Sequence, residues 1–203
     1  MPKANRCKKR AVFLDRDGVI NLPPKHRFIR HWDEFRFIPG TLAAIRRMTV
    51  RKIALVIISN QSGVGRRIMS RARLEEIHRR MMAAVRRHGG KILAAYYCTH
   101  HPDRRCGCRK PKTGMLTKAA REHGIDLNRS IVVGDRETDI LMAHAAGCRS
   151  ALVLSGKHDR KSASRLAVRP DKIFPDLSRT VPWILKEMQK KPSAAIPTPG
   201  RPA

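Results

Sequence analysis

The amino-acid sequence predicts an α/β fold, a doubly wound parallel sheet with helices on both faces. Short apolar runs alternate along the chain with segments in which apolar residues recur at helical spacing. This alternation is typical of parallel sheets whose crossover connections are helices. Polar residues follow several of the apolar runs, and ligands bind outside the carboxyl ends of strands in such sheets.

Strands are expected where apolar or β-branched residues run without interruption. Residues 53–58 form the longest clear run, and the shorter run at 11–14 is cut off by Asp15. The expected strands cover residues 11–14, 53–58, 92–97, 131–133 and 151–154.

Helices are expected between these strands, with capping residues at several of their ends. Ser70 is a favourable N-cap, and Gly89-Gly90 ends the apolar periodicity that follows it. Gly124 and Gly147 end two later segments. The expected helices cover about residues 42–48, 70–88, 113–123 and 136–146.

The chain is expected to form one domain over residues 1–189, because 203 residues suit a single full-sized core. The tail at 190–203 is rich in proline and small residues and is expected to be disordered. Residues 21–39 show no periodicity and are interpreted as a flap over the site.

The chain is expected to be cytoplasmic and not to contact membranes. No apolar run reaches the roughly 18 residues of a membrane span. The apolar stretch after the basic N-terminus ends at Asp15 and is too short for a signal peptide.

The net charge is extreme, since 44 Lys and Arg stand against 16 Asp and Glu and give +28. Such a charge attracts nucleic acid, anionic membranes or phosphorylated small molecules. The basic residues are dispersed along the chain and aromatic residues are only 4%, which leaves few stacking platforms for single strands. The favoured interpretation is a solvated basic surface, with non-specific nucleic-acid affinity as the partner that it allows.

Two carboxylates, Asp15 and Asp17, follow the first expected strand. They could converge on one hard cation while the residue between them points away, and Mg²⁺ takes oxygen ligands together with substrate phosphate. A carboxylate can also attack phosphorus and divide one hard step into two. Ser59 and Lys110 are suited to stabilise a transferring phosphoryl group. The pattern therefore predicts magnesium-dependent phosphoryl transfer.

Four motifs, FLDRDGVIN, ISNQSG, CRKPKTGML and VVGDRETDI, stand in this order along the chain. They resemble the signature motifs of the haloacid dehalogenase superfamily over roughly residues 10 to 155. The resemblance implies a Rossmann-like fold with a minimal cap and a phosphatase that works through an aspartyl-phosphate. It implies that Asp15 is the nucleophile and that Asp17 is the acid and base.

The same resemblance implies the remaining roles. Ser59 and its neighbour Asn60 would bind the phosphoryl group, and Lys110 would neutralise its charge. Asp139 resembles the second acid of the last motif and is expected behind the metal ligands. The magnesium site would comprise Asp15, Asp135 and the main-chain carbonyl of Asp17.

Three of the five cysteines crowd between Cys98 and Cys108. Thiolates and an imidazole within so short a loop suit tetrahedral Zn²⁺, and a polar loop without a core of its own gains order from a metal. His100 or its neighbour His101 could complete the set, and the resemblance selects His100. The expected zinc ligands are Cys98, His100, Cys106 and Cys108.

This cysteine loop, directly before Arg109, resembles the branch of the superfamily that contains heptose-bisphosphate and histidinol-phosphate phosphatases. DRDGVIN and NQSGVGR favour the heptose substrate, a precursor of lipopolysaccharide and other surface glycans. The short stretch between His100 and Cys106 is also typical of the histidinol-phosphate enzymes. The resemblance implies that Arg66 and Arg109 reach the distal end of a phosphorylated sugar.

A different class of function remains open, because DNA 3′-phosphatases share this catalytic core. A nucleic-acid end-processing protein would also suit the charge of +28. No added domain or aromatic-basic patch supports it. The chain is expected to be a monomer.

Overall fold

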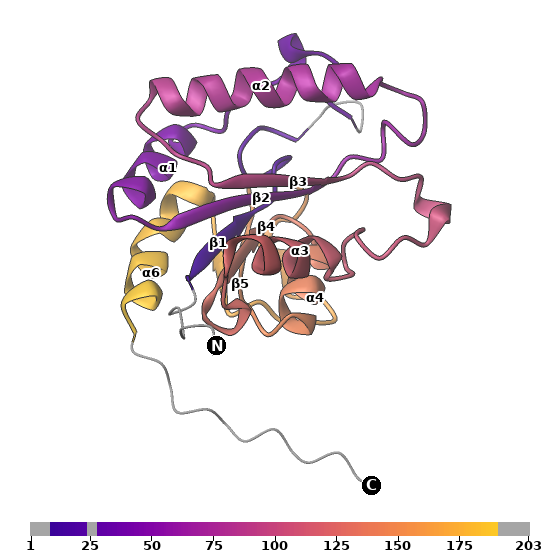
Figure 1. Ribbon diagram of the computed structural model, residues 1–203. Coiled ribbons are helices and arrows are strands. Elements are labelled where there is room, and N and C mark those ends of the chain that lie inside the picture. The colour runs from indigo at the N-terminus through magenta and orange to yellow at the C-terminus, as the bar shows by residue number, and fades with distance from the viewer. Residues whose placement is uncertain (1–8, 24–27, 191–203) are drawn as a thin grey trace, which may run out of the picture.

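The computed structural model describes residues 9–23 and 28–190 (Figure 1). Its strands form one parallel sheet in the order β3-β2-β1-β4-β5-β6. The sheet is therefore doubly wound, as predicted, with β1 near its centre. The strands are β1 (Ala11–Leu14), β2 (Ala54–Asn60), β3 (Ala94–Cys98), β4 (Ile131–Gly134), β5 (Arg149–Val153) and β6 (Lys172–Phe174).

The helices cover both faces of the sheet (Figure 1). α1, α2 and α6 pack on one face, and α3 and α4 pack on the other. The α-helices are α1 (Thr41–Val50), α2 (Arg71–Arg87), α3 (Gly114–His123), α4 (Glu137–Ala145), α5 (Arg160–Ala163) and α6 (Leu177–Gln189). Short 3₁₀ helices are η1 (Trp32–Glu34), η2 (Pro102–Arg104) and η3 (Leu127–Arg129).

The central strands are buried on both faces, which explains their continuous apolar sequence. Successive side chains of a strand point to opposite faces. Val12 and Leu14 accordingly join the core beneath α1, α2 and α6, whereas Ala11 and Phe13 join the core beneath α3 and α4.

The predicted helix ends are confirmed where a capping residue marked them. The Ser70 side chain accepts a hydrogen bond of 3.1 Å from the Arg73 amide and begins α2. Gly124 ends α3 in the left-handed conformation, with φ of 64°, which glycine adopts without strain.

The prediction that residues 151–154 form the last strand is wrong, because β6 and α6 continue the fold. β6 is a three-residue edge strand and too short for a recognisable pattern. α6 contains Pro182, which interrupts a helical pattern in the sequence. The expected strands at 92–97 and 151–154 are shifted by one or two residues relative to β3 and β5, the usual uncertainty of element ends.

Several residues in the described part of segment 21–39 pack on the body of the protein. Ile29, Phe35 and Ile38 are buried, and Asn21 forms isolated bridges with Asp17 and Phe37. Residues 24–27 and the tail at 191–203 lie outside the described residues, so the expectations for them stay predictions. Within the described chain, no helix has both the length and the apolar character needed to cross a membrane.

Candidate active site

The candidate site lies at the carboxyl ends of the central strands. Asp15 follows β1, Ser59 stands near the end of β2, and Asp135 follows β4. β1 pairs with β2 on one side and with β4 on the other. The strand order therefore reverses at the place where open α/β sheets bind ligands.

A cavity of about 400 Å³ opens at this end of the sheet. Its lining includes six of the predicted residues: Asp15, Asp17, Ser59, Asn60, Arg109 and Lys110. It does not include Arg66. Further lining residues are Phe28, Gln61, Ser62, Arg136, Glu137, Thr138, Lys157 and His158.

Lys110 joins two acids beside the cavity. Its Nζ lies 3.0 Å from Asp15 Oδ1 and 2.6 Å from Asp139 Oδ1, and all three side chains are almost wholly buried. Burial alone would lower the pKa of Lys110, but Asp139 and Asp15 outweigh that effect and raise it. The ammonium group is thus held as a permanent cation next to Asp15.

Three carboxylates gather within the site. Oxygen atoms of Asp15, Asp135 and Asp139 lie within 4.8 Å of one another. Burial and the neighbouring Asp15 and Asp139 raise the pKa of Asp135 to about 8. Burial is also the main cause that raises the pKa of Asp139 to about 6. Crowded buried carboxylates of this kind are stabilised by a cation.

One oxygen of Asp135 is a candidate atom for binding the cation. Asp135 is only 1% exposed, and its Oδ1 has no hydrogen-bond partner among the described residues. Its Oδ2 accepts a hydrogen bond of 3.2 Å from the Lys157 amide. The residues therefore fit Mg²⁺, which prefers carboxylate oxygens, with Asp15 and Asp135 as the side chains that would hold it.

Gly18 allows the first motif to approach Asp135 closely. A Cβ at this position would lie 2.5 Å from Asp135 Oδ2, and the residue has φ of +87°. Both the contact and the conformation exclude an ordinary side chain. The glycine of the DRDG sequence thus has a steric role in the site.

The side chain of Asp17 does not converge with that of Asp15 on one cation site, as the spacing had suggested. Its side chain is not part of the three-carboxylate cluster. It accepts hydrogen bonds from Arg16, Asn21 and Gln61 at 2.9–3.0 Å. A contribution of Asp17 to the metal through its main-chain carbonyl stays a prediction.

Arg16, between the two acids, does not point away from both of them as expected. It is fully buried, and its Nη2 donates both to Asp17 and, at 3.0 Å, to Gln61 Oε1. Burial alone would raise the pKa of Asp17, but Arg16 and the hydrogen bonds of Asn21 and Gln61 hold it below its ordinary value. The sequence signal for the pair of Arg16 and Asp17 was an arginine between two aspartates, directly after an apolar strand.

The second motif supports the site mainly through its amides. Asn60 Oδ1 accepts from the Lys110 amide at 3.1 Å, and Asn60 Nδ2 donates to the Lys110 carbonyl at 3.2 Å. Gln61 Nε2 donates to Ser59 Oγ at 3.1 Å. Asn60 therefore fixes the main chain of Lys110, in addition to lining the cavity.

The sequence interpretation missed Lys157 and His158, which follow β5 and line the cavity. Their position just beyond the carboxyl end of an expected strand was the available signal. The amide of Lys157 also contacts Asp135, so this loop completes one wall of the site.

The cysteine loop forms a compact second cluster. Sγ of Cys106 lies 3.6 Å from Sγ of Cys98 and 3.5 Å from Sγ of Cys108. Nδ1 of His100 lies 3.2 Å from Cys108 Sγ and 3.8 Å from Cys98 Sγ. Tetrahedral zinc with the usual bond lengths separates its ligands by about 3.5–3.8 Å. The cluster therefore fits Zn²⁺ through the four predicted residues.

The doubly wound sheet and the Asp15, Lys110, Asp135 and Asp139 arrangement define a hydrolase of the haloacid dehalogenase type. Residues 107–180 match the HAD-hydrolase-like family. The chain is 36% identical to D-glycero-beta-D-manno-heptose-1,7-bisphosphate 7-phosphatase of Bordetella bronchiseptica, over 87% of this chain and 98% of that protein. It therefore belongs to the family of these phosphatases within the haloacid dehalogenase superfamily.

Other relatives are also named as heptose-1,7-bisphosphate 7-phosphatases. The corresponding protein of Pseudomonas aeruginosa is 37% identical over 86% of this chain and 97% of its own length. D-glycero-alpha-D-manno-heptose-1,7-bisphosphate 7-phosphatase of Mycobacterium bovis is 36% identical over 71% of this chain and 79% of its own. The names of these relatives thus include both anomers of the sugar.

Solved structures share the fold. D,D-heptose 1,7-bisphosphate phosphatase from B. bronchiseptica, solved with magnesium and phosphate, gives a TM-score of 0.81 at 36% identity and covers 88% of this chain and 99% of that one. The corresponding protein from Burkholderia thailandensis gives 0.66 at 31% identity, covering 90% and 100%. The chain is a phosphoric monoester hydrolase, as the motifs predicted.

Proposed function

We propose that this phosphatase removes the 7-phosphate of D-glycero-D-manno-heptose 1,7-bisphosphate. The observation that carries the proposal is a cation in the cavity, besides Lys110, that takes part in no ion pair among the described residues. Arg109 lines the cavity beside Lys110, and its buried Nη1 has no hydrogen-bond partner among the described residues. Lys110 is matched by two acids, whereas Arg109 is free to bind a further anion. A bisphosphate supplies that anion.

The first half of the reaction uses Asp15 as nucleophile. Its carboxylate attacks phosphorus, the bond from phosphorus to O7 breaks, and Asp17 gives a proton to the leaving oxygen. Lys110 and Ser59 stabilise the charge of the transferring group. Bound Mg²⁺ shields the negative charge of Asp15 from that of the phosphate. Heptose 1-phosphate is then released.

The second half regenerates Asp15. Water attacks the phosphorus of the aspartyl-phosphate while Asp17 takes a proton from it, and inorganic phosphate leaves. The lowered pKa of Asp17 suits this base step. For the acid step, the leaving oxygen has to replace one of the donors that now surround Asp17, because a carboxyl bound by three donors cannot also give a proton.

The relatives also support the substrate class, since their names specify a sugar bisphosphate. Arg66 is a weaker candidate for binding the distal phosphate. Its Nε is buried without a partner among the described residues, but it does not line the cavity. We therefore assign recognition of the distal phosphate to Arg109.

We further propose a cytoplasmic monomer. The described cysteines are free, and thiols that bind zinc persist in a reducing compartment. Among the described residues, the exposed large apolar side chains are Leu22, Val50, Ile68, Leu93 and Ile173. They belong to five different segments of the chain, whereas an interface presents a contiguous apolar patch. Light scattering of the purified chain tests the monomer.

The test compares phosphate release from both anomers of heptose 1,7-bisphosphate, histidinol phosphate and a 3′-phosphorylated oligonucleotide. Release chiefly from one heptose anomer, abolished by Asp15→Asn, is the expected result. Preference for histidinol phosphate or for the oligonucleotide would be consistent with the phosphatase mechanism but would contradict heptose bisphosphate as the substrate.

Arg109→Met sharpens this test. We expect it to raise KM for the bisphosphate by about tenfold or more, because it removes a charge-assisted contact. Release from heptose 7-phosphate, which lacks the distal phosphate, serves as the matched control and should change much less. An equal effect on both substrates would contradict the assignment of Arg109.

A further inference from the structure

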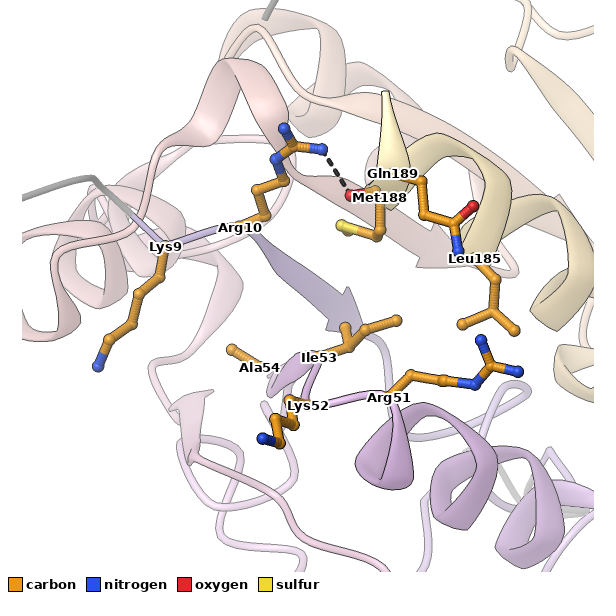
Figure 2. A pocket seen from close by; sticks show the side chains of 9 residues that line it. All are labelled: Lys9, Arg10, Arg51, Lys52, Ile53, Ala54, Leu185, Met188 and Gln189. Carbon is orange, nitrogen blue, oxygen red and sulfur yellow. Dashed lines mark hydrogen bonds between the residues drawn. The ribbon is translucent and has the colours of Figure 1, made fainter. Parts of the chain in front are cut away.

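A basic groove crosses the end of the sheet opposite the active site. Two adjoining hollows of about 370 and 400 Å³ form it, and both are lined by Arg51 and Leu185. One hollow lies where the chain enters β1 and β2 (Figure 2), and the lining of the other includes residues of α1. The length of β1 alone separates the first hollow from Asp15 by roughly 13 Å.

The groove concentrates positive charge. Its lining includes six basic residues and no acidic residue among the described part of the chain. Figure 2 shows Arg10 and Arg51 at the first hollow, with Lys9 and Lys52 extending from its edge. The six basic residues are Lys9, Arg10, Arg46, Arg47, Arg51 and Lys52.

These six charges are unmatched. None takes part in an ion pair within residues 9–23 and 28–190. Glu187, the acid in the last turns of α6, is paired instead with Arg149 and Lys190. Arg10 is held in place, because its Nη1 donates to the Met188 carbonyl at 2.6 Å. Like charges kept together without counter-charges favour binding of a polyanion.

The residues of the groove other than the six basic ones indicate which kind of polyanion it binds. It contains no aromatic side chain apart from His88, so it offers poor stacking for the bases of a single strand. Ile53, Leu185 and Met188 pack against the core, and only Val50 projects, at 68% exposure. A face that inserts into a membrane interface combines basic residues with several projecting apolar side chains. A duplex needs none, because its phosphates lie on the outside.

We propose that this groove binds double-stranded nucleic acid through its phosphodiester backbone, without sequence preference. Arg46, Arg47, Arg51 and Lys52, at the end of α1 and in the turn after it, contact the phosphates. The groove and the active site lie at opposite ends of the sheet, so both ligands bind together.

Fluorescence anisotropy with a labelled duplex of mixed sequence tests the proposal, using the full chain with Zn²⁺ and Mg²⁺. The groove variant is Arg46→Gln, Arg47→Gln, Arg51→Gln and Lys52→Gln. The control variant is Arg71→Gln, Arg79→Gln, Arg121→Gln and Arg169→Gln, which changes four exposed cations elsewhere. Both variants lose the same net charge.

We expect the groove variant to bind the duplex at least about tenfold more weakly than the control variant. The slope of log affinity against log salt should become shallower by about 0.9 for each phosphate that the variant no longer binds. Phosphate release by the groove variant should equal that of the unchanged protein, which also shows that the variant is folded. Saturating duplex should leave phosphate release unchanged.

Three results would overturn the proposal. Equal losses of affinity in the two variants would mean that duplex binding follows net charge rather than the groove. Inhibition of phosphate release by the duplex would place the duplex at the other end of the sheet. Groove-dependent binding to phosphatidylserine vesicles, without binding to the duplex, would assign the surface to a membrane.

Discussion

The two ends of the parallel sheet use charge in opposite ways. At the carboxyl end, two sets of buried charges are matched: Lys110 lies between Asp15 and Asp139, and Arg16 is paired with Asp17. At the amino end, the basic groove carries exposed charges without partners. Matched buried charges position atoms for chemistry, whereas unmatched exposed charges attract a ligand from solution. The basic groove holds six of the 44 Lys and Arg residues that give the net charge of +28.

The largest expected effect separates the two ends. Asp15→Asn should lower phosphate release by on the order of 10⁴-fold, because it removes the nucleophile and keeps the shape. A phosphate assay checks this loss. The same variant should bind the duplex as the unchanged protein does, and a parallel loss of duplex affinity would show that the ends are not independent.

Lys110→Met tests the matched charges of the carboxyl end. It leaves Asp15 and Asp139 buried without their shared cation, and we expect a loss of stability of about 3–5 kcal/mol. Phosphate release should fall by about 10²–10³-fold. Urea unfolding and the phosphate assay measure the two effects.

A second substitution separates stability from chemistry in that variant. Lys110→Met with Asp139→Asn removes one of the stranded charges and should recover part of the lost stability, but no activity. Full recovery of activity would show that Lys110 only balances Asp139.

A substitution in the zinc cluster tests whether bound zinc stabilises the loop before Lys110. Cys106→Ser should remove bound zinc and lower stability by about 2–4 kcal/mol, since the loop loses the metal that orders it. Elemental analysis and thermal unfolding check both. Cys148→Ser, at a buried cysteine outside the cluster, is the control and should retain zinc.

The smallest expected effect concerns His78, whose Nδ1 lies 2.9 Å from the Tyr97 hydroxyl. Burial, and then Arg16 and Arg86, lower its pKa from 6.5. The folded state therefore resists protonation, and stability is lost as pH falls below about 6.5. His78→Gln should reduce that loss by less than about 1 kcal/mol between pH 7 and pH 5.

Urea unfolding at a series of pH values measures this dependence. Tyr97→Phe removes the hydrogen bond but keeps His78 buried beside Arg16, so it should retain the slope. An unchanged slope in His78→Gln would show that neither burial nor the nearby arginines lower the pKa of His78 in the folded protein.

Much of the fold was predictable, because its signals are local. The apolar runs predicted the first five strands, β1 to β5, and Ser70 and Gly124 predicted helix ends that the structure confirms. The edge strand β6 and α6 were missed because three residues form no period and Pro182 disrupts one. Such elements are stabilised by contacts with the rest of the fold rather than by their own sequence.

The residues that meet in the site were also predictable, because the motifs contain the chemical groups at the strand ends. Their mutual orientation was not. The pair of Arg16 and Asp17 also contacts a third group, Gln61, from the loop after β2. The contribution of Lys157 depends on where the loop after β5 folds. Contacts between distant segments leave no periodic trace in a sequence.

The strand order has a consequence for how an active molecule forms. Asp15 lies at the centre of the sheet, and its partners Ser59, Lys110 and Asp135 follow it along most of the chain. During synthesis, the first motif emerges early but has no complete site until residues near 157 have left the ribosome. Unpaired parallel strands fold slowly, since their contacts are distant in sequence. Catalytic activity in a refolding experiment therefore reports closure of the whole sheet, and no fragment that ends before β4 can acquire it.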